Sequence, residues 1–223
     1  MAVALVVSTG AIGYGASPTT TPAIDTTGAD FLVVGAHCWE ASPDWVLSDS
    51  KGNTWQELTA YRENGGSGSA QLFYCYNPTV GMNHTFTLTS TQNYKTITVA
   101  AFSGMLTTSG VFDKENGNHN SSGTTITCGS ITPAQSGELL IALYSDGYSS
   151  SSAKSIDSSF IKQEDQYNGN DMSGALAYRV YGDTAAINPT WTWTEQSCAH
   201  AAAIAAFKQA AGGSDTIKMI WTK

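Results

Sequence analysis

Short apolar runs separated by polar turns are the dominant pattern of this chain of 223 residues. Segments 31–36, 97–102 and 138–143 are largely apolar, as expected of central strands covered on both faces. Segments 85–89 and 190–194 alternate threonine with Phe, Leu or Trp, so each presents one apolar face. The pattern predicts many short β-strands.

Clusters of Gly, Asn, Ser and Pro punctuate these runs, at 64–69, 77–83, 116–123 and 146–154. Such clusters are typical of turns between strands. The Ala-rich segment 198–207 could form a helix, but its counterpart in the repeat described below is β-branched, so we predict a strand. The apolar start, MAVALVVSTG, has no basic region before it and is predicted to be the first strand, not a signal peptide.

The chain contains an internal repeat of roughly 105 residues. Four segments recur in the same order, with offsets between 104 and 108 residues, and the turn SDSKGNTW lies opposite SIDSSF. The residues that match are Phe31 and Leu139, Leu72 and Leu176, Phe86 and Trp191, and Phe102 and Phe207. We infer a duplication with repeats 1–104 and 105–209.

These patterns predict an all-β fold, a jelly-roll-like β-sandwich over residues 1–209 built from the two repeats. Two tandem domains of immunoglobulin size are the alternative, although no Pro-rich or charged linker separates the halves. Residues 210–223 are predicted to be a flexible linker followed by a C-terminal β arm.

The arm is apolar and β-prone, and a single strand is marginally stable in water. It therefore packs on its own domain or adds to a sheet of a neighbouring molecule, and we favour the neighbour. Its assembly residues are Thr216, Ile217, Met219, Ile220 and Trp221.

The chain is acidic, with a net charge of −8 and a pI near 4.7. Nucleic-acid binding usually requires a basic face, so we expect no nucleic-acid partner. The sequence has no apolar run of the roughly 18 residues that span a bilayer, so membrane insertion is not expected.

Four cysteines, Cys38, Cys75, Cys128 and Cys198, each fall within a predicted strand and show no C-x-x-C spacing. Buried free thiols are the favoured interpretation because cysteine packs as a small apolar residue. Disulfides remain the alternative, with three connectivities.

The stretch SDSKGNTW (48–55) has two interpretations. Asp49 and Asn53 could give oxygen ligands to Ca²⁺, but six to eight oxygens are needed and the second repeat loses the Gly-Asn pair. A tight turn is favoured, with Asp49 accepting hydrogen bonds from the following backbone and Trp55 pointing inward. We expect no metal and no cofactor.

A ligand site is predicted where a central strand of each repeat runs into a loop. Aromatic faces beside carboxylates suit carbohydrate, because rings stack on C–H faces while polar groups bind hydroxyls. Trp191 and Trp193 could form a similar platform, but their counterparts are core residues, so we predict that they belong to the core. The predicted ligand residues are Trp39, Glu40, Asp44 and Trp45 in the first repeat, and Tyr144, Asp146 and Tyr148 in the second.

Catalytic motifs are not found. The sequence has no G-x-S-x-G, no H-E-x-x-H and no phosphate-binding glycine loop. We therefore expect a protein that is not an enzyme. A glycoside hydrolase or lyase remains an alternative, since its two carboxylates could come from distant strands.

The series FLVVGAH, SDSKGNTW, AQLFYCYNP, HTFTLT and ITVAAFSG resembles a broad class of uncharacterised jelly-roll-like β-sandwich modules. Such modules occur in bacterial secreted proteins and in phage virion proteins. The resemblance covers most of residues 1–209 and carries no catalytic residues. It implies a structural or adhesion component of a virion (decoration, fibre or tail) or of an extracellular surface. Its expected partners are its own copies or other virion or surface proteins. A carbohydrate-binding module of a secreted protein is the alternative.

Overall fold

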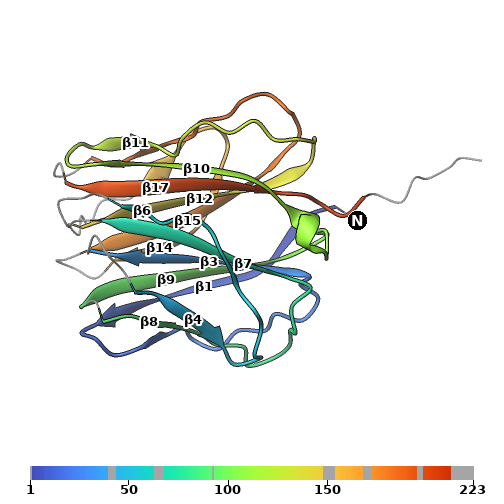
Figure 1. Ribbon diagram of the computed structural model, residues 1–223, viewed down its shortest axis with the longest axis horizontal. Coiled ribbons are helices and arrows are strands. Elements are labelled where there is room, and N and C mark those ends of the chain that lie inside the picture. The colour runs from blue at the N-terminus through green and yellow to red at the C-terminus, as the bar shows by residue number, and fades with distance from the viewer. Residues whose placement is uncertain are drawn as a thin grey trace, which may run out of the picture.

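Each half of the chain forms two antiparallel sheets of its own, one large and one small, in the computed structural model (Figure 1). The structure describes residues 2–39, 44–62, 68–91, 93–147, 154–167, 172–194 and 198–211. Among these residues the only helical element is the 3₁₀ turn η1 (Ser109–Val111) near the junction of the halves. They contain no helix long and apolar enough to cross a bilayer. The prediction of an all-β sandwich fold is confirmed.

The first half has a six-stranded sheet and a three-stranded sheet. Across the large sheet the strands are β1 (Ala4–Tyr14), β9 (Tyr94–Ser103), β3 (Phe31–Cys38), β7 (Ser69–Tyr76) and β5 (Gln56–Glu57), with β6 (Tyr61–Arg62) also paired to β7. The small sheet contains β2 (Thr19–Thr20), β8 (Phe86–Thr89) and β4 (Val46–Asp49).

The second half has a five-stranded sheet and a three-stranded sheet. The large sheet contains, in order, β10 (Phe112–Asn120), β17 (His200–Phe207), β12 (Glu138–Asp146), β15 (Ser173–Tyr181) and β14 (Ile161–Tyr167). The small sheet contains β11 (Thr125–Thr127), β16 (Thr190–Thr192) and β13 (Ser155–Ile156). The Ala-rich segment is thus strand β17, as predicted, and the N-terminal apolar run is β1.

The two halves have the same strand order. In each half the chain passes from the large sheet to the small one and back in the same succession, the alternation expected of a jelly roll. The strands at matching places are those that the sequence repeat pairs, such as β3 with β12 and β9 with β17. The origin of this correspondence by duplication stays a prediction. The sequence favoured one sandwich shared by both repeats, whereas in the structure each half has a sandwich of its own.

The four sheets form four layers, with the two large sheets in the middle (Figure 1). One apolar cluster lies between the large and small sheets of each half. A third cluster lies between the two large sheets and contains residues of both halves, including Phe31, Leu72, Phe102, Leu143 and Phe207. This arrangement explains the continuously apolar strands, because β3 and β12 are buried along their whole length, with one sheet against each face.

The contact between the halves is reciprocal. Strand β7 packs against β17, and β9 packs against β15. Because β7 corresponds to β15 and β9 corresponds to β17, each half contributes the same two strands to the contact. The edges match as well, since β1 contacts β14 and β6 contacts β10. Glycines admit the opposing side chains at both edges: a Cβ on Gly10 would lie 2.4 Å from Gln166 Nε2, and one on Gly117 would lie 2.4 Å from the Tyr61 ring. The halves therefore meet through equivalent surfaces, as in a two-fold dimer.

The layer between the large sheets is aromatic at one end and polar at the other. Phe31 and Phe207 pack with their rings tilted and their centroids 4.8 Å apart, near the ends of β3 and β17. At the opposite end His37 is fully buried, with its Nε2 3.0 Å from Thr98 Oγ1. Burial lowers the pKa of His37 to about 3, and the backbone of Tyr144 in the other half opposes this shift. His37 is therefore neutral at pH 7.

Gly174 should be essential to this polar end, because a Cβ there would lie 2.4 Å from His37 Cγ and 2.5 Å from Thr96 Oγ1. We expect Gly174→Ala to lower the free energy of unfolding by about 1–3 kcal/mol through overpacking. Gly182→Ala is the matched control, since a Cβ there meets nothing within 4 Å. Urea unfolding curves measure both, and equal stabilities would contradict the close packing of the halves.

His37 should make folding sensitive to acid. The unfolded chain binds a proton at a pKa near 6.5, whereas the folded protein excludes it down to about pH 3. Stability is therefore lost as the pH falls from 6.5 towards 3. At pH 4 we expect the loss relative to pH 7 to be smaller in His37→Gln than in the wild type, by on the order of 3 kcal/mol. Other titrating groups are present in both proteins, so identical pH profiles from urea unfolding would refute the assignment.

Candidate functional site

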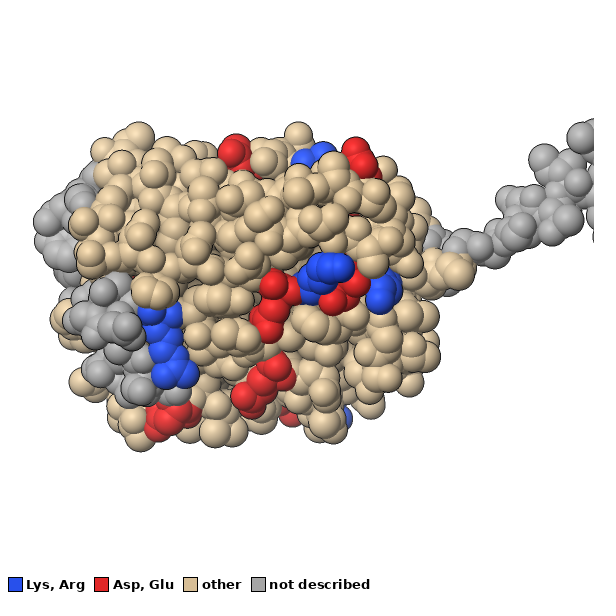
Figure 2. Space-filling view, turned by 45° about the horizontal axis from the view of Figure 1, so that its top comes forward, with Lys and Arg blue, Asp and Glu red and all other residues tan. Residues whose placement is uncertain are grey.

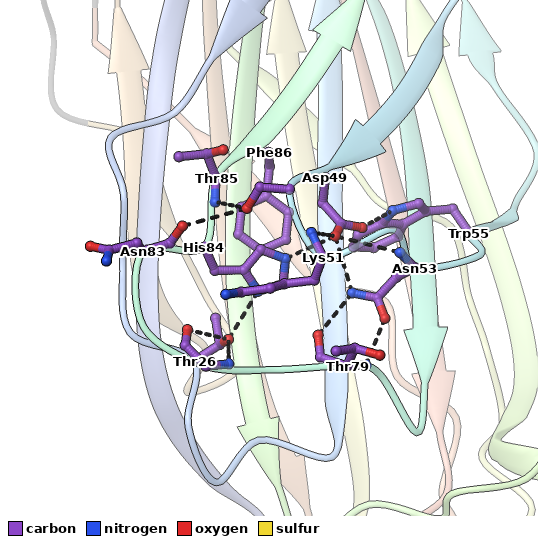
Figure 3. Close-up of polar contacts among 12 residues, drawn as sticks. Thr26, Asp49, Lys51, Asn53, Trp55, Thr79, Asn83, His84, Thr85 and Phe86 are labelled. Atoms are coloured by element: carbon purple, nitrogen blue, oxygen red, sulfur yellow. Dashed lines mark hydrogen bonds and ion pairs between the residues drawn. The ribbon is translucent and has the colours of Figure 1, made fainter.

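Asp49, at the end of β4, organises the SDSKGNTW turn (Figure 3). Its Oδ1 accepts a hydrogen bond from the Lys51 backbone N–H at 2.8 Å, and its Oδ2 accepts one from Trp55 Nε1 at 2.8 Å. Gly52 adopts a φ of 73°, the left-handed conformation that favours glycine. The predicted tight turn is confirmed, and Trp55 packs inward against the core of the first half.

The same carboxylate reaches a buried histidine that the sequence did not reveal (Figure 3). Asp49 Oδ1 lies 3.0 Å from His84 Nε2, and His84 Nδ1 lies 2.9 Å from Thr26 Oγ1. Burial lowers the pKa of His84, and the hydrogen bond to Asp49 opposes the shift. A neutral ring with its proton on Nε2 donates to Asp49 and accepts from the Thr26 hydroxyl.

A hydroxyl, an imidazole and a carboxylate in line resemble the catalytic arrangement of hydrolases. Here, however, Thr26 is fully buried, and its Oγ1 accepts a further hydrogen bond from the Gly81 N–H at 3.0 Å. A substrate cannot reach a hydroxyl so enclosed. The chain Thr26–His84–Asp49 therefore acts as a brace that ties the end of β4 to the segments that carry Thr26 and His84.

The predicted ligand residues of the first half that the structure describes have different surroundings. Trp39 is 36% exposed and packs 5.6 Å from the ring of Tyr94. Asp44 accepts hydrogen bonds from Ser90 Oγ at 2.7 Å and the Thr91 N–H at 2.9 Å, which hold its pKa at about 2. Trp45 is only 7% exposed and belongs to the core, which corrects its predicted role as a ligand residue. Glu40 lies outside the described residues.

In the second half the predicted aromatic and acidic residues turn inward. Tyr144 and Asp146 are fully buried, and the Tyr144 hydroxyl donates to Asp146 Oδ2 at 3.0 Å. Asp146 also accepts from the Ser173 hydroxyl at 2.7 Å, although burial raises its pKa to about 6. Both residues therefore belong to the interior and neither can contact a sugar, contrary to their predicted role as ligand residues. Tyr148 lies outside the described residues.

Trp191 and Trp193 pack against Tyr144, with ring centroids 5.9 and 4.9 Å away. They are 0% and 2% exposed, so the preference for a core role over a sugar platform is confirmed.

Two buried carboxylates do lie close together among the described residues, those of Glu138 and Asp113, whose side chain is 7% exposed. Burial raises the pKa of Glu138, and the neighbouring Asp113 raises it further. Asp113 Oδ1 also lies 3.6 Å from Lys208 Nζ. Glu138 and Asp146 are both buried but stand at opposite ends of β12, roughly 26 Å apart at strand spacing. Asp49 belongs to the other half and is occupied by the brace. No group of three His, Cys, Asp or Glu side chains suited to a metal occurs among these residues.

The four cysteines are buried free thiols, as predicted. Burial raises the pKa of Cys75 to about 11 and that of Cys198 to about 12. Thiolates form only rarely at neutral pH under these conditions, so the cysteines act as packing groups.

Open space occurs instead at two surface grooves in corresponding parts of the two halves. Each lies between the turn after β4 or β13 and the end of β7 or β15. The first, of about 320 Å³, is lined by Gly52, Asn53, Thr54, Gln56, Cys75, Tyr76, Asn77 and Thr79. The second, of about 460 Å³, is lined by Ser158, Arg179, Tyr181, Gly182, Asp183, Ala186, Ile187 and Asn188.

Comparison of the chain with protein-family models, curated proteins and solved structures finds no significant match.

The brace can be tested by removing its carboxylate. We expect Asp49→Ala to lower the free energy of unfolding by about 3–5 kcal/mol, because the buried His84 and the partly buried Trp55 indole lose their acceptor together. Asp25→Ala is the matched control. Asp25 also accepts backbone and hydroxyl hydrogen bonds, from Thr27, but is exposed, so its variant should stay close to the wild type. Unfolding curves in urea measure both, and equal losses would contradict the brace.

Proposed function

We propose that the protein is a non-catalytic structural or adhesion component displayed on a particle or cell surface. The specific form that we favour is a phage virion protein (decoration, fibre or tail). The observation that carries this proposal is that both described ends of the chain lie at one rim of the four-layer stack. A module held at that rim presents its opposite rim and its sheet surfaces to other molecules.

Contacts at Gly104 define this rim. A Cβ on Gly104 would lie 2.5 Å from the Ala2 carbonyl oxygen, so the segment just before β1 passes directly against it. The Ala210 N–H donates a hydrogen bond to the Gly104 carbonyl at 2.9 Å. The two described ends therefore meet beside the connection between the halves. Force applied through either end acts next to the core shared by both halves.

The surface chemistry suits association through neutral polar groups. Charged residues make up only 13% of the chain, and most of the face in Figure 2 carries no charged side chain. The overall charge of −8 still keeps copies soluble before they assemble. Localisation on a virion or an extracellular surface fits this combination.

The C-terminal arm supplies the assembly contact in this proposal. Its residues Thr216–Trp221 lie outside the described residues, so their role rests on sequence. Strand β4 is a suitable acceptor because it pairs only with β8 among the described strands, which leaves its other edge open. Val46 on β4 is 62% exposed. Addition of the arm to β4 of a neighbour would satisfy the edge and cover this side chain.

Deletion of residues 213–223 should weaken self-association and leave the stack folded, because the arm follows the last described strand. Sedimentation velocity at matched concentrations measures the assembly, and urea unfolding measures the fold. Val46→Lys, which keeps the arm but places a charge at the acceptor edge, should weaken association in the same way.

Tyr14→Lys serves as the control, since Tyr14 is 59% exposed on the edge strand β1 of the large sheet. It should assemble like the wild type. If deletion of the arm leaves the assembly state unchanged in sedimentation, the arm does not mediate self-association and this part of the proposal is wrong.

Carbohydrate binding is the second candidate function. Of the residues first predicted for it, Trp45, Tyr144 and Asp146 are buried, and the two surface grooves now favour it. A sugar would then be the ligand of the adhesion role.

A further inference from the structure

We propose that the two corresponding grooves are paired binding sites for a neutral oligosaccharide, one in each half of the protein. This inference rests on the proposed adhesion function and names its ligand class. The groove of the first half is called the amide groove, after Gln56 and Asn77, and that of the second half the arginine groove, after Arg179.

Each groove is held open by a side chain that joins its two walls. In the amide groove, Asn53 Nδ2 donates to the Thr79 carbonyl at 3.0 Å, and Asn53 Oδ1 accepts from the Thr79 N–H at 2.7 Å. In the arginine groove, Arg179 Nη1 donates to the Ser158 carbonyl. Both grooves thus exist before a ligand arrives, which reduces the entropy lost on binding.

The arginine groove offers donors and acceptors together. Arg179 has five N–H donors, and its guanidinium lies 4.8 Å above the ring of Tyr181, which fixes its orientation. Asp183 Oδ1 accepts from the Thr184 and Ala185 N–H groups, and the described protein gives its Oδ2 no donor. The exposed amide of Asn188 adds both a donor and an acceptor. Neighbouring sugar hydroxyls, each able to donate and accept, match this set.

The amide groove presents the same chemistry without charge. The side chains of Gln56 and Asn77 are exposed and make no hydrogen bond within the described protein, and Thr54 and Thr79 add hydroxyls. Asn77 adopts a φ of 50°, a left-handed backbone conformation that is energetically unfavourable for most residues other than Gly, Asn or Asp. The partly exposed Tyr76 provides an aromatic surface for the C–H face of a sugar.

Charge identifies the ligand as neutral. The amide groove has no charged lining residue, and in the arginine groove Asp183 offsets Arg179. An acidic saccharide would also be repelled by the overall charge of −8. Apolar ligands do not fit, because both linings expose unpaired amides, hydroxyls or charges that would lose water without gaining a partner.

Two sites on one rigid body increase adhesion to a surface with repeated sugars. The first bound oligosaccharide raises the effective concentration of the next at the other groove. Weak individual sites are then sufficient on a polymeric ligand. Repeated copies of the protein on a particle would extend the same effect.

The test begins with the full-length protein on an array of neutral and acidic oligosaccharides. The strongest neutral oligosaccharide is then titrated by calorimetry. We expect binding to neutral sugars, with two sites per chain. Asn188→Ala and Asn77→Gly each remove one amide without removing a protein hydrogen bond, and glycine suits the φ of position 77. Each variant should weaken one site at least fivefold, and the double variant should weaken both.

Asn120→Ala is the matched control, since Asn120 is an exposed amide on β10 outside both grooves. It should bind like the wild type. Gln56→Ala gives a second variant of the amide groove should Asn77→Gly alter the fold, which urea unfolding reports. No binding to neutral oligosaccharides, binding of acidic ones alone, or undiminished binding by the double variant would overturn the proposal. Sedimentation of the same variants should match the wild type, so failure here is separable from failure of the assembly role.

Discussion

The packing of one large sheet against the other is the constraint on which the rest of the structure depends. It buries the second face of β3, β7, β9, β12, β15 and β17, and these strands are apolar on both sides for that reason. A single two-layer half would leave this apolar face in water. Each half therefore needs the other, even though each has its own strand order and its own core between a large and a small sheet.

Tight contact between the large sheets determines where polar groups are allowed. Glycines at Gly10, Gly117 and Gly174 let side chains of the other half approach, and a neutral His37 occupies the polar end of the layer. Elsewhere in the interior, buried histidines and acids form hydrogen bonds with other buried polar groups. The brace of Thr26, His84 and Asp49 and the pair of Tyr144 and Asp146 both satisfy buried polar groups. These hydrogen-bonded polar groups therefore stabilise the interior.

The features on which the proposed roles rest lie at the surface. The described chain ends share one rim, and two rigid polar grooves lie at equivalent positions in the halves. The proposed roles follow from that geometry: attachment or assembly near the chain ends and recognition by paired neutral sites. A body with two corresponding grooves suits the proposed adhesion, because two weak sites on one chain act together.

The sequence by itself determined the strand content, the turn at Asp49, the burial of the cysteines and of Trp191 and Trp193, and the matching order of the halves. These features depend on local periodicity, on turn residues and on comparison of the two halves of the sequence, all of which can be read from the sequence itself. Only the tertiary structure decided that Trp45, Tyr144 and Asp146 turn inward, because a residue at a strand end can face either the core or the solvent. It alone brought His84 to Asp49 across 35 residues and assembled the grooves from separate loops. The number of layers was likewise decided by packing, since a strand that is apolar on both faces does not specify which sheet will cover it.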